Sequence, residues 1–211
     1  LLLGSADNGV GRFDYAQGFW LSTWTSANWL DDNEIFGIER VGNQLFILNG
    51  DYLQPYNTSN GVFTAAYELQ DFGLSQSGAA MMVWPSIGAA SPTQDALVVS
   101  DASGLLAHLI PGKNPLLEGT LRLASGPGTE EMGALAELNN VLYIASLDGT
   151  GINRYDIGNT LWLQPLPFNG DALTLTTDGT DLFVASSAST ITQMDTAGTT
   201  LLEWTSQGCW G

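Results

Sequence analysis

Short runs in which apolar and polar residues alternate recur along the whole chain, and these runs are rich in Val, Ile, Leu, Thr and aromatic side chains. A period of two residues predicts β-strands, because successive side chains of a strand point to opposite faces of a sheet. No long window keeps the period of an amphipathic helix. The pattern therefore predicts an all-β chain.

One pattern of apolar run, turn, second strand, Gly-containing turn and third strand occurs five times. Its copies begin at Leu1, Leu45, Leu97, Leu142 and Leu182, so successive starts are 44, 52, 45 and 40 residues apart. A period of about 40–50 residues is typical of one four-stranded propeller blade. We therefore expect a single β-propeller domain of about five four-stranded blades, or part of a larger propeller. The approximate repeats are 1–44, 45–95, 96–140, 141–180 and 181–211.

Four apolar segments lie between these hairpins, and several of their residues are small. Each leads through a polar or Gly turn into the next repeat, which predicts the innermost strand of a blade, where packing near the axis is crowded. The segments are 35–38, 81–84, 134–138 and 172–175. The first repeat has no such segment before it, so we expect its inner strand to come from residues 206–211, from another chain, or from sequence outside residues 1–211.

The second turn of each copy carries the clearest recurring signal. An apolar residue is followed by Asp or Asn, which bonds its own backbone, and a Gly follows that supplies a positive φ. We interpret these residues as structural turn formers before ligands. They are Asp14, Asn57, Asp156 and Asp195, with Gly18, Gly61, Gly158 and Gly198; Ile110, Pro111 and Gly112 take the equivalent places in the third copy.

The segments Leu142–Trp162, Leu182–Trp204 and Leu1–Trp20 resemble the repeat of pyrroloquinoline-quinone-type propellers. That repeat has an apolar strand, a small residue, Asp-Gly, a second strand, Asp, Gly and then Trp. The resemblance covers nearly the whole chain and implies the fold alone, because enzymes, scaffolds, lectins and adhesins share it. The chain has no vicinal Cys pair and no basic cluster for the quinone carboxylates. A fragment of a quinoprotein dehydrogenase is therefore the least favoured function.

The charge of the chain is strongly one-sided, with 22 acidic residues against 5 basic ones and a net charge of −17. This balance disfavours nucleic acid and anionic membranes as partners, because both need Lys and Arg contacts. The longest apolar stretch, 78–90, is too short to span a membrane and contains Pro85. A composition poor in Lys and rich in Gly, Ser, Thr, Ala and Asp is typical of extracellular or cell-surface proteins. The single cysteine, Cys209, is a free thiol or pairs between chains.

The sequence shows no metal-binding His–Cys spacing, nucleophile elbow or phosphate loop, and His108 is its only histidine. We therefore expect no enzymatic activity, no catalytic residues and no resident cofactor. Asp31, Asp32 and Glu34 form a small acidic group that either binds Ca²⁺ weakly through its oxygens or is simply a solvated loop.

The seven tryptophans fall into two groups. Trp20, Trp162 and Trp204 lie at or near one repeat position, which predicts packing between blades. Trp24, Trp29 and Trp210 fall outside that register and are candidates for stacking on a sugar ring. Asn57 begins the only Asn-x-Ser/Thr sequon, so it is a glycosylation candidate as well as a turn residue.

These observations favour a non-enzymatic extracellular propeller that works as a structural or interaction module. An unpaired blade edge accepts a strand from a neighbour, so we expect self-association through blade edges and the repeating subunit of a fibre or surface assembly. The alternative is a lectin-like propeller that binds glycans or another ligand. The chain begins inside a blade and without Met, so we expect a processed chain or a segment of a longer one.

Overall fold

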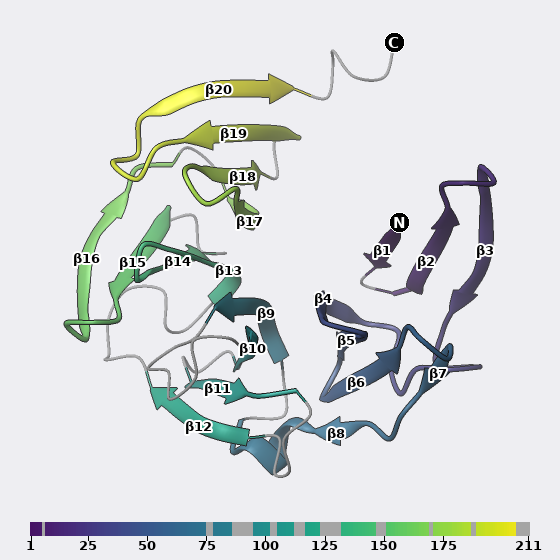
Figure 1. Ribbon diagram of the computed structural model, residues 1–211. Coiled ribbons are helices and arrows are strands. Elements are labelled where there is room, and N and C mark those ends of the chain that lie inside the picture. Colours follow the sequence, from purple (N-terminus) through teal and green to yellow (C-terminus); the bar gives the residue numbers. More distant parts are fainter. Residues whose placement is uncertain are drawn as a thin grey trace. The chain divides into compact units, whose positions relative to one another are not determined.

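The computed structural model describes residues 1–5, 7–74, 78–85, 95–101, 105–111, 117–122, 132–146, 151–168, 171–186 and 189–205. Within these residues the regular structure is β-strand, apart from one short 3₁₀-helix, η1 (Leu69–Phe72), which ends at Gly73 in the left-handed conformation. The all-β prediction is therefore confirmed (Figure 1). No helix in the described part is long and apolar enough to cross a membrane.

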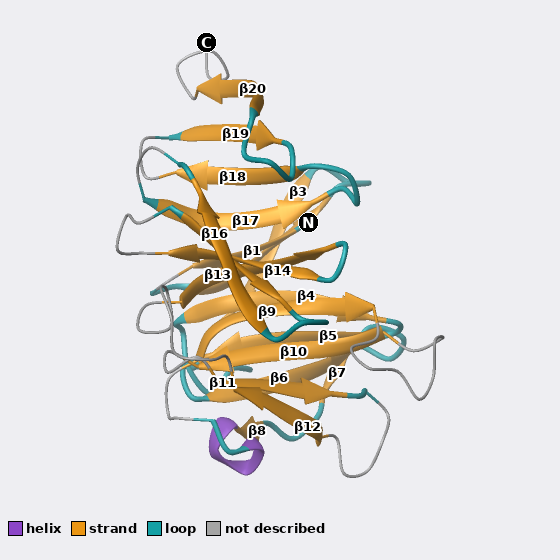
Figure 2. Cartoon of the chain, turned by 90° about the vertical axis from the view of Figure 1, so that its left-hand side faces the viewer, coloured by secondary structure: helices purple, strands orange, loops and turns teal. Residues whose placement is uncertain are grey.

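The described strands form five antiparallel sheets, each built from strands that follow one another in the chain (Figure 2). Sheet 1 contains β1 (Leu2–Ser5), β2 (Gly9–Asp14) and β3 (Phe19–Trp24). Sheet 2 contains β4 (Ile35–Val41), β5 (Gln44–Asn49), β6 (Tyr52–Asn57), β7 (Val62–Phe63) and β8 (Tyr67–Glu68). Sheet 3 contains β9 (Gly78–Pro85), β10 (Asp95–Asp101), β11 (Leu105–Leu109) and β12 (Leu117–Arg122). Sheet 4 contains β13 (Met132–Leu138), β14 (Val141–Ser146), β15 (Ile152–Asp156) and β16 (Leu161–Leu166). Sheet 5 contains β17 (Ala172–Thr177), β18 (Leu182–Ser186), β19 (Thr190–Met194) and β20 (Thr200–Thr205).

The order of strands within each sheet is that of a propeller blade. In sheets 2 to 5 the first strand of the sheet is the segment that ends the preceding repeat: β4, β9, β13 and β17 pair with β5, β10, β14 and β18. This confirms the four predicted inner strands. Sheet 1 has three described strands, and β1 pairs with β2 alone among the described residues. The chain is thus an all-β propeller of five blades.

The described chain forms two compact units. The first unit holds sheets 1 to 3, in Leu1–Asp101 and Leu105–Leu121, and the second holds sheets 4 and 5. In both units a sheet packs face to face on the next sheet in the chain. We call the face toward the preceding sheet the N-side face and the face toward the following sheet the C-side face.

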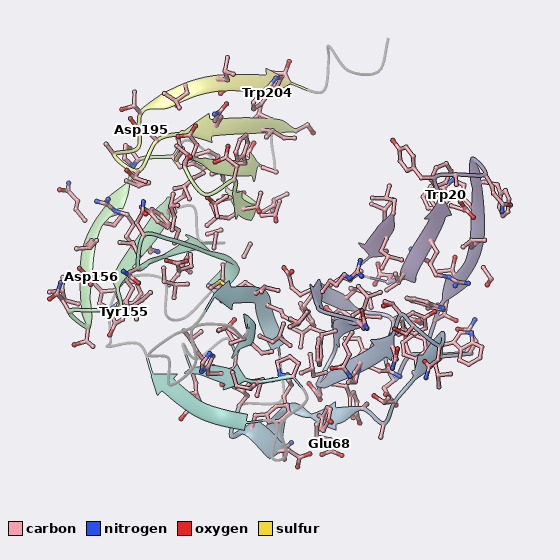
Figure 3. All side chains as sticks on the ribbon, in the orientation of Figure 1. Trp20, Glu68, Tyr155, Asp156, Asp195 and Trp204 are labelled. Atoms are coloured by element: carbon pink, nitrogen blue, oxygen red, sulfur yellow. The ribbon has the colours of Figure 1, made fainter. Side chains whose placement is uncertain are left out.

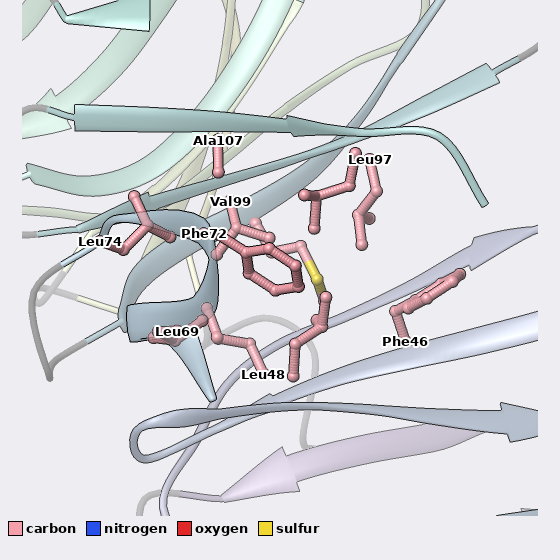
Figure 4. Close-up of a cluster of buried hydrophobic side chains, with 11 residues drawn as sticks. Phe46, Leu48, Leu69, Phe72, Leu74, Leu97, Val99 and Ala107 are labelled. Atoms are coloured by element: carbon pink, nitrogen blue, oxygen red, sulfur yellow. The ribbon is translucent and has the colours of Figure 1, made fainter. Parts of the chain in front are cut away.

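Three apolar cores fill the spaces between consecutive sheets within the units. Val10, Trp24, Leu30 and Ile47 form the core between sheets 1 and 2. Phe46 and Leu48 of sheet 2 meet Leu97 and Val99 of sheet 3, with Leu69 and Phe72 of η1 closing the same core (Figure 4). In the second unit the core between sheets 4 and 5 is formed by residues that include Tyr143, Ile152, Leu166, Leu182 and Val184. Each core is built from alternate residues of neighbouring strands, as the period of two predicts.

Strand register makes the blades comparable residue by residue. Leu45 lies opposite Tyr56, Leu142 opposite Tyr155 and Leu182 opposite Met194. In sheet 3, however, Leu97 lies opposite Leu109, not Ile110. The predicted equivalence of Ile110 and Pro111 is therefore off by one residue. The sequence offered no Asp or Asn in this turn to fix the alignment.

The inner strands of sheets 2 and 3 lie so close together that only a small side chain fits between them at one position. A Cβ atom added to Gly37 of β4 would lie 3.1 Å from Cβ of Met81 on β9. A glycine at this position lets the two inner strands pack closely, because a side chain there would displace Met81.

Arg154 on β15 ties sheet 4 to sheet 5. Its Nε donates to the carbonyl of Gln164 at 2.8 Å, and Nη1 donates to the carbonyl of Thr196, in the turn after β19, at 3.2 Å. Arg12 holds the same position in sheet 1, where Nε donates to the carbonyl of Ser22 and the guanidinium lies 4.6 Å from the ring centre of Trp24. The arginine at this repeat position thus bonds carbonyl groups of two sheets in sheet 4, and bonds one carbonyl group and packs on an indole ring in sheet 1.

Candidate interaction surfaces

The recurring Asp and Asn residues act in the structure as turn formers. The Oδ1 atom of Asp14 accepts the N–H groups of Ala16 and Gln17, and that of Asn57 accepts the N–H of Ser59. Asp156 and Asp195 accept bonds in the same way, from Asn159 and from Ala197 and Thr199. These bonds hold the hairpin turns closed.

The positive φ of these turns falls on Gly18, Gly61 and Gly198, as predicted. In sheet 4, however, the residue with a positive φ is Thr160, at 54°, and Gly158 is not among the residues with positive φ. The predicted role of Gly158 is therefore wrong. The turn has the same length as that after Asp14, so position Asp156 + 4, not the nearest glycine, adopts the left-handed conformation. A β-branched residue is strained there.

Hydrogen bonds in the turns also lower the pKa values of three of their carboxyl groups. The Asn159 side chain lowers the pKa of Asp156, and the backbone N–H of Asp181 lowers the pKa of Asp178. The backbone N–H of Thr199 does the same for the pKa of Asp195. All three groups are solvent-exposed, so these carboxylates stay charged and structural.

The acidic group Asp31, Asp32 and Glu34 lies in the loop between β3 and β4. Oδ1 of Asp32 accepts the N–H of Glu34 at 2.9 Å, and the N–H of Asp31 donates to the side chain of Gln54. Among the described residues, no three His, Cys, Asp or Glu side chains are placed to hold a metal ion together. The loop therefore does not bring these three carboxylates into one group.

Trp29 is presented by the same loop, whose backbone is held by several bonds. The N–H of Thr25 donates to Oδ1 of Asn28, the N–H of Trp29 donates to the carbonyl of Thr25, and the carbonyl of Trp29 accepts from Gln54 at 2.8 Å. The indole is 56% exposed and stacks on Phe63 with ring centres 6.2 Å apart and planes 20° apart. One indole face is thus supported, and the side chain is largely open to solvent.

Trp24 cannot stack on a sugar. It is 4% exposed, packed against Tyr56 and Phe63 with ring centres 4.6 and 5.0 Å away. The prediction that grouped Trp24 with Trp29 is wrong, because the loop after β3 places only the second tryptophan at the surface. Trp210, the third candidate, lies outside the described residues.

Strand register also changes the grouping of the other tryptophans. Trp20 lies opposite Phe13 as Trp162 lies opposite Tyr155, and both ring pairs are edge-on at 5.2 Å. This confirms the shared position of Trp20 and Trp162. Trp204 lies opposite Ile191, as Trp24 lies opposite Val10, so Trp204 and Trp24 are the second equivalent pair.

The sequon residue Asn57 ends β6 and begins an exposed turn. Its side-chain oxygen accepts the N–H of Ser59 at 2.9 Å, while Thr58 and Ser59 are exposed. Asn57 therefore uses its side-chain oxygen to hold the turn. Glycosylation of this residue stays a prediction.

Glu39 on β4 is the one described carboxyl group whose pKa burial raises strongly. It lies opposite Phe46 on the C-side face of sheet 2, among apolar residues of the core with sheet 3. Loss of solvent raises the pKa of Glu39 to about 7. An ionised group in this position opposes the packing of the two sheets.

The N-side face of sheet 1 is apolar and bare in its unit, that is, no other sheet of the first unit packs on it. It carries Leu1, Leu3, Phe13 and Trp20, since Phe13 bonds Leu1 through the backbone and lies opposite Trp20. Leu3 is 48% exposed and Trp20 is 59% exposed, whereas the equivalents of Leu3 on the N-side faces of sheets 2, 3 and 5 are fully buried. Those equivalents are Ile47, Val99 and Val184.

The C-side face of sheet 5 is bare in its unit in the same way, since sheet 4 packs on the opposite face. Register places Phe183, Ile191, Leu202 and Trp204 on this face, opposite to the one that packs on sheet 4. Ile191 is 48% exposed, whereas Val10, Leu53 and Ile152 at the same position of sheets 1, 2 and 4 are fully buried. Trp204 is 42% exposed against 4% for Trp24. Trp20 and Trp204 are labelled in Figure 3.

These two faces share one chemical feature. Neither carries an Asp, Glu, Lys or Arg side chain among its described strand residues, in a chain with a net charge of −17. Contiguous apolar patches of this kind mark interaction sites. They could not be found from the sequence, because the same positions are buried in the other blades.

No known protein family matches the chain, and no curated protein is similar to it. Among solved structures, the chain is similar to Sqt1 of Saccharomyces cerevisiae, with 14% identity and a TM-score of 0.62 over 97% of this chain and 58% of that one. It is also similar to the computationally designed Ika8 protein, with 16% identity and a TM-score of 0.53 over 96% of this chain and 57% of that one. The chain thus spans a little over half the length of each. This likeness supports the propeller fold and does not connect the repeats with pyrroloquinoline-quinone-type propellers in particular.

Proposed function

We propose that this chain is a non-enzymatic protein-interaction module and that it builds an extracellular or cell-surface assembly. A propeller blade stack commonly binds other proteins, and the observation that carries the proposal here is the pair of bare apolar faces on sheets 1 and 5. Apolar side chains that are buried in equivalent blades are exposed in these two sheets. A protein partner that covers them removes this surface from water.

Self-association is the form of interaction that the chain supports best. Besides its bare face, sheet 1 has a strand at its edge, β1. This strand pairs with β2 alone among the described residues. Edge strands pair readily with strands of another molecule. The proposed assembly is a fibre or surface layer in which this chain is the repeating unit.

Electron microscopy and native mass spectrometry of the material from its source test this proposal. We expect the chain in complexes with protein, as ordered assemblies whose repeat is close to one propeller diameter. A free, single-chain particle at every concentration would contradict an assembly function.

A second candidate function is glycan binding at Trp29. The favouring observation is the exposed indole, which stacks on Phe63 and belongs to a hydrogen-bonded loop that continues into Asp31 and Asp32. Sugar rings stack on such indoles while carboxylates accept hydrogen bonds from sugar hydroxyls. Binding to a glycan array that is lost in Trp29→Ala and kept in Trp20→Ala supports it; an array with no response removes it.

A further inference from the structure

We propose that a Ca²⁺ ion binds where the loop between β3 and β4 crosses the end of β5, with Oδ1 of Asn49 and Oδ2 of Asp32 among its ligands. Both residues lie in the first unit. The site goes beyond the interaction function, since its ligand is a metal ion and not a macromolecule. It also differs from a cluster of three carboxylates, which the described residues do not form.

The first argument is a buried acceptor that the described chain leaves unsatisfied. Asn49 is completely buried, and its Oδ1 has no hydrogen-bond partner among the described residues. Leaving a buried acceptor unpaired costs about 1–3 kcal/mol. A cation at this oxygen removes that cost.

The neighbours of Asn49 show that the unpaired atom is the oxygen of its amide. Nε2 of Gln54 donates to the carbonyl of Trp29 at 2.8 Å, so Oε1 of Gln54 faces the other way. There Oε1 accepts the N–H of Asp31 at 3.3 Å and Nδ2 of Asn49 at 3.1 Å. Turning the Asn49 amide round would set two oxygens against each other. The unpaired atom therefore accepts and cannot donate, as a metal ligand must.

The second argument comes from the other blades. In sheets 1, 3 and 5 the same repeat position is held by Ser5, Asp101 and Ser186. Each of these side chains bonds a residue three or four positions further on, in or after the hairpin turn. In sheet 2 the turn is only two residues long, because Asn49 pairs directly with Tyr52. The oxygen of Asn49 is thus left for a group outside the hairpin.

The third argument is a carboxylate at the same end of β5. The N–H of Gly50 donates to the carbonyl of Glu34 at 2.9 Å, which brings the loop across the end of the strand. A Cβ atom added to Gly50 would lie 2.9 Å from Oδ2 of Asp32, so a glycine is needed for the carboxylate to approach this closely. Oδ1 of Asp32 accepts the N–H of Glu34, and Oδ2 lies against the residue that follows Asn49.

The donor atoms at this crossing select the kind of ion. An amide oxygen, a carboxylate and backbone carbonyls are hard oxygen ligands, and Ca²⁺ binds such mixtures in flexible geometry. Mg²⁺ demands a stricter octahedral arrangement. The net charge of −17 raises the concentration of cations around the chain. With one carboxylate in the set, we expect a Kd of about 10⁻⁴–10⁻³ M.

Isothermal titration calorimetry with CaCl₂, on the full chain after removal of metals with EDTA, tests the site. Asp32→Asn removes the charge and keeps an oxygen that can accept the N–H of Glu34. Asn49→Ala removes Oδ1 outright. Asp71→Asn is the matched control, since Asp71 is an exposed carboxylate on η1 of the same unit and its loss changes the net charge equally.

Circular dichroism and thermal unfolding without calcium verify that each variant is folded. If Asn49→Ala is not folded, Asp32→Asn decides the test. NMR spectra of the unmodified chain give a second measurement that needs no variant. Calcium should shift the amide signals of residues 31–34 and 49–54 most strongly.

We expect the unmodified chain and Asp71→Asn to bind one Ca²⁺ with the same Kd. Each site variant is expected to bind at least ~10-fold more weakly, because it has lost a ligand oxygen or its charge. Calcium should also raise the unfolding temperature of the unmodified chain and of Asp71→Asn, and leave that of the site variants unchanged.

Three results would overturn the calcium site. The first is no binding and no thermal shift at about 10 mM CaCl₂, roughly ten times the weakest Kd expected; a buried water then satisfies Asn49. The second is site variants that bind like the unmodified chain, because the ion then lies elsewhere on the acidic surface. The third is equal affinity for Mg²⁺. None of these results bears on the interaction function, which is judged by the state of the native material.

Discussion

Two residues of this chain have side chains that do not suit their positions. Thr160 adopts a φ of 54°, a conformation that glycine adopts in the equivalent turns of sheets 1, 2 and 5. Glu39 is a carboxyl group held against an apolar core. Both residues cost folding energy, so both give predictions at the residue scale.

Replacing Thr160 by Gly is expected to stabilise the chain by about 0.5–1 kcal/mol. A β-branched residue in the left-handed region is strained by about 1–2 kcal/mol, of which the greater freedom of unfolded glycine offsets part. Chemical denaturation measures the change. Gly61→Ala, in the equivalent turn, is the matched control and is expected to destabilise by about 1 kcal/mol. A loss of stability in Thr160→Gly would contradict the strain.

Replacing Glu39 by Gln is expected to remove a pH dependence of stability. The pKa of Glu39 is about 7 in the folded chain against 4.5 for the ordinary group, so the folded state binds more protons between these pH values. The wild-type free energy of unfolding therefore falls as pH rises through this window and stays low above it.

The effect is of the order of 1–3 kcal/mol, fully present above about pH 7 and absent below about pH 4.5. Urea unfolding of wild type and Glu39→Gln at several pH values checks it. Glu203→Gln, at an exposed carboxylate, serves as the control. Parallel pH profiles for wild type and Glu39→Gln would show that Glu39 is solvated.

At the scale of elements, the alternating pattern and the Asp/Asn–Gly turns were sufficient to predict the all-β fold and the inner strands of sheets 2 to 5. The alignment failed at Ile110, because its turn has no Asp or Asn to mark the register, and at Gly158, because the left-handed φ falls on Thr160, four residues after Asp156, and not on the glycine. It also failed for Trp24 and Trp204. Their equivalence depends on bulges between Val10 and Arg12 and between Gln193 and Met194, and a bulge shifts register without a mark in the sequence.

The interaction faces could not be predicted for a different reason. Leu3 and Val184 have the same place in the alternating pattern of their repeats, which puts both on an N-side face. Only the arrangement of sheets decides that Val184 is buried and Leu3 is exposed. Exposure at a face is thus a property of neighbouring elements and not of the strand itself.

The bridge made by Arg154 gives the prediction at this scale. Arg154→Lys is expected to destabilise the chain by about 1–2 kcal/mol, because an ammonium group cannot donate to the carbonyls of Gln164 and Thr196 with the same fork. Thermal unfolding measures the change. Arg40→Lys is the control, since Arg40 donates within its own hairpin to Gly42 and is expected to change stability by less than ~0.5 kcal/mol. Equal effects of the two substitutions would exclude a bridge between the sheets.

At the scale of the whole molecule, charge and apolar surface oppose one another. The net charge of −17 separates copies, whereas the bare faces of sheets 1 and 5 attract them. Salt screens the first effect and leaves the second largely unchanged.

Self-association is therefore expected to strengthen, several-fold, as the sodium chloride concentration rises. Sedimentation equilibrium over a series of salt concentrations measures this. An association held by ion pairs weakens under the same conditions, so the sign of the salt dependence separates the two kinds of contact. Leu161→Asp, at an exposed strand leucine of sheet 4 outside both faces, must follow the wild-type trend.

The packing of sheet 2 on both of its faces sets an order of local opening. Its strands contribute to the core with sheet 1 and to the core with sheet 3, whereas sheets 1 and 5 each bury one face within their units. Amide protons of β5 and β6 should then exchange with solvent only in rare, large-scale openings, and those of β1, β2, β19 and β20 in frequent small ones. Joining of copies would slow exchange at the two ends of the chain and leave its middle unchanged, so protection of the terminal blades would record the state of assembly.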